Sequence, residues 1–149
     1  MSNPLLLDYL FVGELIAARV RSQVTGLDGV DPVEELAQVS EAHIVKQRVF
    51  VMWGGEDFAG GEGGRAAGGR SQAVTQRWTV LLAVRNAGQV NKDARNASAG
   101  PLLAALHKAL AGWTPEGAFR PFYRLNGPKP TYRANVAAYP LTFGIDFNL

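Results

Sequence analysis

Residues 74–86 read VTQRWTVLLAVRN and make the longest alternating run of apolar and polar side chains in the chain. Side chains two positions apart share one face of a strand. The apolar members of one face are Trp78, Val80, Leu82 and Val84. The opposite face has an arginine near each end, Arg77 and Arg85, with a mildly apolar strip between them. The run predicts a core strand whose second face suits contact with another protein.

Three helices and three more strands are expected around this strand. A long, unusually apolar helix should start at Asn3 and Pro4 and run to about Val20, since an Asn N-cap followed by proline favours a helix start. The apolar face of this helix is wide enough for a central core helix or for a contact with another subunit. Asp31 should cap a short second helix that ends near residue 40, and a third should run from about Pro101 to Gly112.

The other strands are expected over residues 47–53, 119–125 and 139–149, with residues 87–98 and 127–130 as connections. Pro121 places the second of these strands at a sheet edge. These elements predict one α+β domain over residues 1–149. Its mainly antiparallel sheet of about four strands should carry two to three helices packed on one face.

A glycine-rich stretch, residues 54–72, interrupts this pattern, and eight of its first sixteen residues are glycine. A phosphate-binding loop would need a Gly-Lys-Ser/Thr ending that opens a helix, whereas this run leads through Arg70 and Ser71 into a strand. The stretch is therefore expected to be a long, flexible hairpin loop or an arm that becomes ordered on a partner.

The composition excludes several classes of protein. The chain has 149 residues, 47% of them hydrophobic, and no cysteine, so disulfide scaffolds, thiolate zinc sites and cysteine nucleophiles are ruled out. The longest apolar stretch, residues 5–12, contains Asp8 and is too short to span a bilayer. A soluble cytoplasmic protein is the expectation.

Charge is distributed unevenly along the chain. Residues 1–53 carry four cations and seven acids, a net of −3, and residues 54–73 carry a net of −1. Residues 74–149 carry nine cations and three acids, a net of +6. Such polarity suits either nucleic acid or contact between the acidic part of one copy and the basic part of another.

No motif for catalysis or metal binding is present in the sequence. His43 and His107 are far apart and lack a neighbouring catalytic motif, and both are expected at the surface or an edge. Glu34 and Glu35 are explained by a helix N-terminus. We therefore expect no catalytic, cofactor-binding or metal-binding residue, and a small enzyme built from scattered residues is the least favoured class.

Three segments of the second half resemble the tail terminator family of long-tailed bacteriophages and Mu-like prophages. They are RWTVLLAVRN at residues 77–86, PLLAALHKALAGWTP at residues 101–115, and the closing strand of alternating aromatic residues. The resemblance covers residues 74–149 and rests on structural motifs. The glycine-rich run is more extreme than the family pattern leads one to expect.

The resemblance implies a structural virion protein of the tail or neck, assembled in the bacterial cytoplasm. It implies a homo-hexameric ring that caps the tail tube, stops tube polymerisation and provides the interface for head joining. The implied partners are other copies of the chain, the tail-tube protein and the head–tail connector or neck proteins. No membrane or cofactor is implied, and DNA enters only as cargo passing through the ring lumen.

Six cations are the expected partner contacts. Residues 54–72, with Arg65 and Arg70, are expected to reach a neighbouring ring. The tube or neck partner is expected at Arg77, Arg85, Lys92 and Arg95. Two alternatives stay open: another neck or tail ring component, such as a head–tail connector or tail-tube subunit, and a basic nucleic-acid-binding domain using the charge of residues 74–149.

Overall fold

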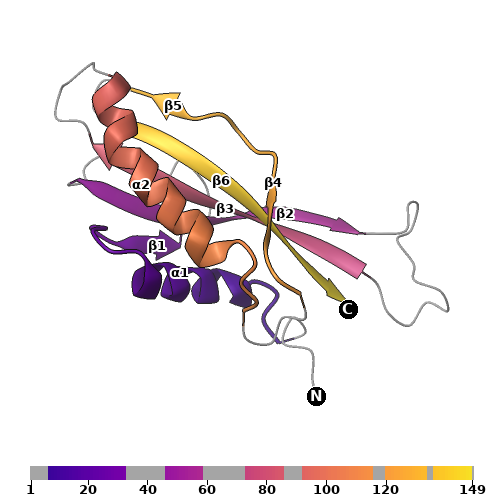
Figure 1. The fold of residues 1–149 in the computed structure, drawn as a ribbon. Helices are drawn as coiled ribbons and strands as arrows, with labels where there is room; N and C mark the ends of the chain where they lie inside the picture. Colours follow the sequence, from indigo (N-terminus) through magenta and orange to yellow (C-terminus); the bar gives the residue numbers. More distant parts are fainter. Residues whose placement is uncertain are drawn as a thin grey trace.

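The computed structural model describes residues 7–32, 46–58, 73–85, 92–115, 120–133 and 136–148, with side chains in the fourth range from residue 99 onward. They form one α+β domain of two helices and six strands (Figure 1). The elements in chain order are α1 (Phe11–Gln23), β1 (Val30–Pro32), β2 (Gln47–Phe58), β3 (Ala73–Arg85), α2 (Lys92–Leu110), β4 (Tyr123–Leu125), β5 (Thr131–Tyr132) and β6 (Val136–Asn148).

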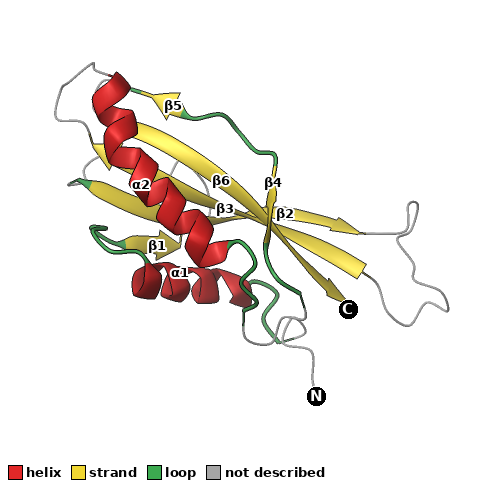
Figure 2. Cartoon of the chain, viewed as in Figure 1, coloured by secondary structure: helices red, strands yellow, loops and turns green. Residues whose placement is uncertain are grey.

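The strands form one open, mixed sheet in the order β1-β2-β3-β6-β4, with β5 also paired to β6 (Figure 2). β1 runs parallel to β2, and all other pairs are antiparallel. The sequence predicts about four strands, and the two additional ones, β1 and β5, have only three and two residues. Strands this short contain too few residues for an alternating pattern to be recognised.

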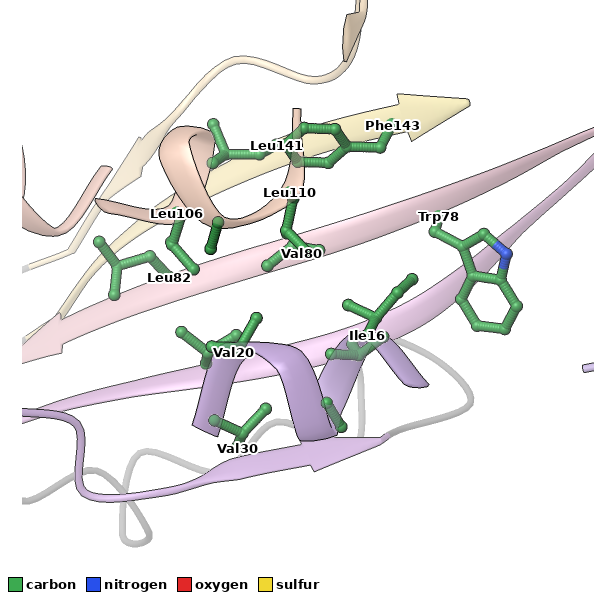
Figure 3. Close-up of a cluster of buried hydrophobic side chains, with 14 of the residues drawn as sticks. Ile16, Val20, Val30, Trp78, Val80, Leu82, Leu106, Leu110, Leu141 and Phe143 are labelled. Atoms are coloured by element: carbon green, nitrogen blue, oxygen red, sulfur yellow. The ribbon is translucent and has the colours of Figure 1, made fainter. Parts of the chain in front are cut away.

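Both described helices pack on the same face of the sheet, as the sequence predicts. Their buried side chains share one core with the inward faces of β2, β3 and β6 (Figure 3). On β3 this face holds the four predicted residues, and Trp78 is only 4% exposed. The alternation in β6 is confirmed too, with Tyr139, Leu141 and Phe143 buried beneath the helices.

The opposite face of the sheet also carries a small buried cluster. It consists of Phe50, Met52, Leu81, Ala83 and Val136. The expectation that the middle of this face contacts another protein is therefore wrong for β3, because its apolar strip is already buried within the chain. On β2, both faces are covered over residues 49–52.

The first helix begins later than the sequence predicts. Residues 7–10 form turns, and the helix starts at Phe11. Asp8 makes the turn, since its carboxylate accepts a hydrogen bond from the Leu10 N–H at 3.0 Å and its carbonyl accepts one from the Phe11 N–H. A short acidic side chain stabilises such a turn in competition with helix. The predicted cap at Asn3 and Pro4 lies outside the described residues.

Asp31 and Pro32 belong to β1 rather than to a helix cap. The Asp31 carboxylate forms an ion pair with Arg48 of the neighbouring β2. This cross-strand partner uses the oxygen that was expected to cap the short second helix. Residues 33–45 of that helix lie outside the described part of the chain.

β2 extends five residues into the stretch predicted as a glycine-rich loop. Its pairing with β3 shifts between Trp53 and Glu56, where Gly54 and Gly55 sit in a bulge. Gly55 has φ of +94°, a conformation that glycine adopts at little cost. The glycines therefore bend the strand rather than end it. Residues 59–72 lie outside the described residues.

The second described helix starts at Lys92, within the segment predicted as a loop, instead of at Pro101. Pro101 lies inside α2 and is exposed. A proline inside a helix removes one hydrogen bond and costs about 3 kcal/mol, which is why the sequence favoured a helix start there. The burial of Leu106, Ala109 and Leu110 beyond the proline offsets this cost.

β4 is shorter than its predicted strand, and Phe119 lies outside the described residues. The chain before it pairs with the end of α2, because the Phe122 N–H and C=O bond to Trp113 and Gly112. Phe122 then stacks on Trp113 with ring centroids 5.8 Å apart. β4 lies at the edge of the sheet, as the position of Pro121 predicts.

Candidate assembly surfaces

The cations predicted to contact partners do not form one group. Arg77 is exposed on the face opposite the helices, where it forms an ion pair with Asp57. Arg85 is eight positions further along β3, roughly 27 Å away at the rise of a strand, and is half-buried. The backbone of Lys92 and Arg95 lies in the first turns of α2. Arg65 and Arg70 lie outside the described residues.

A different surface is built from exposed apolar side chains on the turn before α1 and on the second half of β2. Leu7 is 83% exposed, Leu10 and Phe58 are each 43% exposed, and Trp53 is 39% exposed. These are four of the six large exposed hydrophobic residues among those described. Tyr9 joins the turn to β2, since its ring meets that of Trp53 edge-on with centroids 6.1 Å apart. We call Leu7, Leu10, Trp53 and Phe58 the apolar patch.

The turn that carries half of the apolar patch is fixed to the sheet by a buried amide. Gln76 is completely buried on the helix side of β3. Its Nε2 donates to the carbonyl oxygen of Tyr9 at 2.7 Å, and its Oε1 accepts from Nε1 of Trp78 at 3.2 Å. An amide side chain with both ends bonded holds a fixed orientation. The turn is therefore held rigidly over β3.

Tyr9 and Glu56 place two polar groups beneath the apolar patch. Burial first, and then the adjacent Glu56 carboxylate, raise the pKa of Tyr9 to about 12. The Tyr9 hydroxyl and Glu56 Oε2 are buried and make no hydrogen bond with the described residues. Unbonded buried polar atoms are uncommon in folded proteins.

A second surface runs along the opposite edge of the sheet, from Arg120 to Arg133, and we call it the basic strip. It has four cations among fourteen residues and no acid. All its described side chains are exposed except Phe122, which is buried, and Leu125, which is half-buried. Its cations are Arg120, Arg124, Lys129 and Arg133. Neither of the two ion pairs between described residues, Arg48–Asp31 and Arg77–Asp57, involves these four cations.

Contacts with β6 fix the course of the basic strip. Arg124 lies over the ring of Phe143 at 5.5 Å and donates to the carbonyl oxygen of Thr142 at 3.0 Å. Tyr123 donates its hydroxyl to Asp146 at 2.8 Å, and Thr75 donates to the same carboxylate oxygen at 2.6 Å. Burial raises the pKa of Tyr123. These bonds hold β4 against the sheet, with Arg124 packed on β6 and the side chains of Arg120, Lys129 and Arg133 exposed.

Catalytic and metal-binding chemistry finds little support in the part of the chain that the structure describes. It contains no group of three His, Cys, Asp or Glu residues able to hold a metal ion. His107 is half-buried rather than a surface residue, with Nδ1 2.8 Å from the carbonyl oxygen of Leu103 and its ring near Phe143. His43 lies outside the described residues. No described helix is long and apolar enough to cross a membrane.

Of the two surfaces, only the basic strip has a signal in the sequence. Arg120 to Arg133 contains no acid, but the charge was considered over residues 74–149 as a whole. The apolar patch combines residues from two segments that are separated by more than forty positions, so it could only be recognised once α1 and β2 were placed together.

Comparison with known proteins gives one result. A family model described as "Phage tail terminator protein" matches residues 6–149, nearly the whole chain. A search of curated proteins returned no match. The family match extends the resemblance from the second half of the chain to α1, β1 and β2.

Proposed function

This chain belongs to the phage tail terminator family and is a structural component of the virion tail, and from that premise we propose that it caps the tail tube. In this proposal, six copies form a ring on the last ring of the tube. The ring stops tube polymerisation and provides the interface that joins the head. The partners are other copies of the chain, the tail-tube protein and the head–tail connector or neck proteins.

The observation that supports this proposal is the apolar patch. Scattered exposed hydrophobic residues are ordinary, but a group on a rigid support is typical of a protein-binding surface. Gln76 supplies the rigid support by fixing the turn at Tyr9. Aromatic residues such as Trp53 are also enriched among the residues that contribute most to binding.

A ring of identical subunits requires two different surfaces on each copy, because the contacts run head to tail. The apolar patch lies by α1 and β2, whereas the basic strip follows β4 and β5 on the opposite side of the sheet (Figure 1). The apolar patch can supply one of these two contact surfaces, and the different character of the basic strip gives each copy a defined direction. The same arrangement would serve a tail-tube subunit or a head–tail connector.

Electron microscopy of the purified protein separates a terminator from a tube subunit. A terminator stacks on one side only, so the protein alone should form single rings or smaller species at any concentration. A tube subunit has complementary top and bottom surfaces and should form long tubes. Long tubes of the protein alone would contradict the proposed capping role.

A further inference from the structure

The basic strip differs in composition from the apolar patch, and the difference points to a different kind of partner. The centre of a protein–protein contact is depleted in lysine and acidic residues, whereas arginine and tyrosine are enriched there. The strip instead combines four cations with exposed hydroxyl and amide side chains. Protein–DNA contacts are more polar and much more positively charged than contacts between proteins.

The strip is also long and continuous. Arg124 pairs with Phe143 and Thr131 with Ala138, so the two ends of the paired edge are five residues apart along β6. Five residues of a strand span about 17 Å, and Arg120 and Arg133 lie beyond both ends. Duplex DNA carries about one charge per 1.7 Å of axis with both strands counted, so this length of duplex carries about ten phosphates, of which the strip faces those on one side.

Two exposed tyrosines accompany the cations. Tyr123 is 38% exposed and Tyr132 is 46% exposed. Tyrosine hydroxyls bond to phosphate and sugar oxygens, and such contacts position a protein on DNA without reading its sequence. Two described acids lie near Tyr123: Asp146, whose oxygen accepts from Tyr123 and Thr75, and Asp57, which is paired with Arg77.

We propose that the basic strip binds duplex DNA through its phosphates, without sequence preference. The contact goes beyond the proposed capping function, in which DNA only passes through the ring. Phosphate contacts of this kind are weak at physiological salt and exchange rapidly. They would hold the duplex at the strip while still letting it slide.

The test measures binding of the purified full-length protein to a random-sequence 20-base-pair duplex at several salt concentrations. Four phosphate contacts predict a slope of about −3.6 for log affinity against log salt. The variant K129Q/R133Q should lower that slope by about 1.8 and weaken binding at least tenfold at 50 mM salt. The matched control R21Q/K46Q removes the same charge elsewhere and should change binding much less.

A competition experiment distinguishes a DNA partner from an acidic protein partner. Poly-glutamate at the same charge concentration should compete poorly for the strip, because it lacks the fixed spacing of duplex phosphates. Equal competition by poly-glutamate, or equal loss of binding in the two double variants, would overturn the proposal. Unchanged DNA affinity in K129Q/R133Q, with loss of ring assembly, would show that the strip contacts protein instead. None of these results depends on whether the protein terminates tails.

Discussion

At the scale of single residues, Gly13 shows how closely α1 approaches the sheet. A Cβ at this position would lie 2.8 Å from Cζ3 of Trp78, a distance that forces the ring or the helix to move. Such overpacking typically costs about 1 to 3 kcal/mol, so Gly13→Ala should lower stability despite the better helix propensity of alanine.

Gly100 provides the matched control, since it is also helical but a Cβ added there would meet no atom within 4 Å. Gly100→Ala should change stability by less than about 1 kcal/mol, because the better helix propensity of alanine is opposed by its contact with the ring of Pro101, the next residue. Urea unfolding of both variants measures the difference. If Gly13→Ala is the more stable of the two, the close contact between α1 and Trp78 is wrong.

Tyr9 gives a prediction for alkaline pH. The folded protein raises the pKa of Tyr9 to about 12, whereas tyrosine in an unfolded chain titrates near 10. The folded state therefore holds the proton more tightly, and its contribution to stability is complete below pH 10 and is lost as the pH rises towards 12.

Tyr9→Phe removes this titration. Thermal unfolding between pH 9 and 12 should show a steeper loss of stability for the unsubstituted protein than for the variant, by up to about 1.4 kcal/mol per pH unit. Parallel curves would contradict the burial of the Tyr9 hydroxyl near Glu56.

At the scale of elements, substitutions of two neighbouring residues in β3 test which face of the sheet each side chain lies on. Trp78 is buried beneath α1, so Trp78→Ala should destabilise by about 3 to 5 kcal/mol. Its neighbour Arg77 points to the other face and forms an exposed ion pair with Asp57, so Arg77→Ala should cost less than about 1 kcal/mol. Chemical denaturation measures both. A larger loss for Arg77→Ala would mean that the faces are reversed.

Long alternating strands could be predicted from the sequence, while short or bent elements could not. In β3 and β6 the side chains of the helix-facing side follow the period of two and are buried, although residues 80–84 and 141–145 are buried on both faces. β1 owes its place to parallel pairing with β2, a long-range contact that leaves no local pattern. The bulge at Gly54 and the proline inside α2 are local features that suggest an end to the element, and tertiary packing overrides them.

The functional surfaces were less predictable than the fold. The expected contacts at Arg77 and Arg85 followed from their places in one strand, but the first is paired with Asp57 and the second is half-buried. The apolar patch depends on the position of a turn, which Gln76 fixes from a strand almost seventy residues away. Such a contact cannot be inferred from a local pattern.

At the scale of the whole molecule, the apolar patch should matter for assembly rather than for folding. Phe58 and Tyr132 are similarly exposed, but only Phe58 lies in the patch. Phe58→Ser and Tyr132→Ser should each change stability by about 1 to 2 kcal/mol. Loss of an aromatic residue central to a contact costs at least about 2 kcal/mol, so Phe58→Ser should weaken assembly roughly thirtyfold.

Yields of assembled protein rings from each variant, counted by electron microscopy with solubility and unfolding curves as controls, measure this difference, because ring assembly does not require the DNA contact proposed for the strip that contains Tyr132. Equal yields for the two variants would remove the apolar patch from the assembly contact.

The central claim is that this protein ends the growth of the tail tube. Electron microscopy of particles made with its gene disrupted, scoring tail length and head attachment, tests it most directly. We predict overlong or ragged tails without heads, and recovery of uniform, head-bearing tails when the intact chain is supplied. Tails of normal length joined to heads in the disrupted strain would contradict the claim.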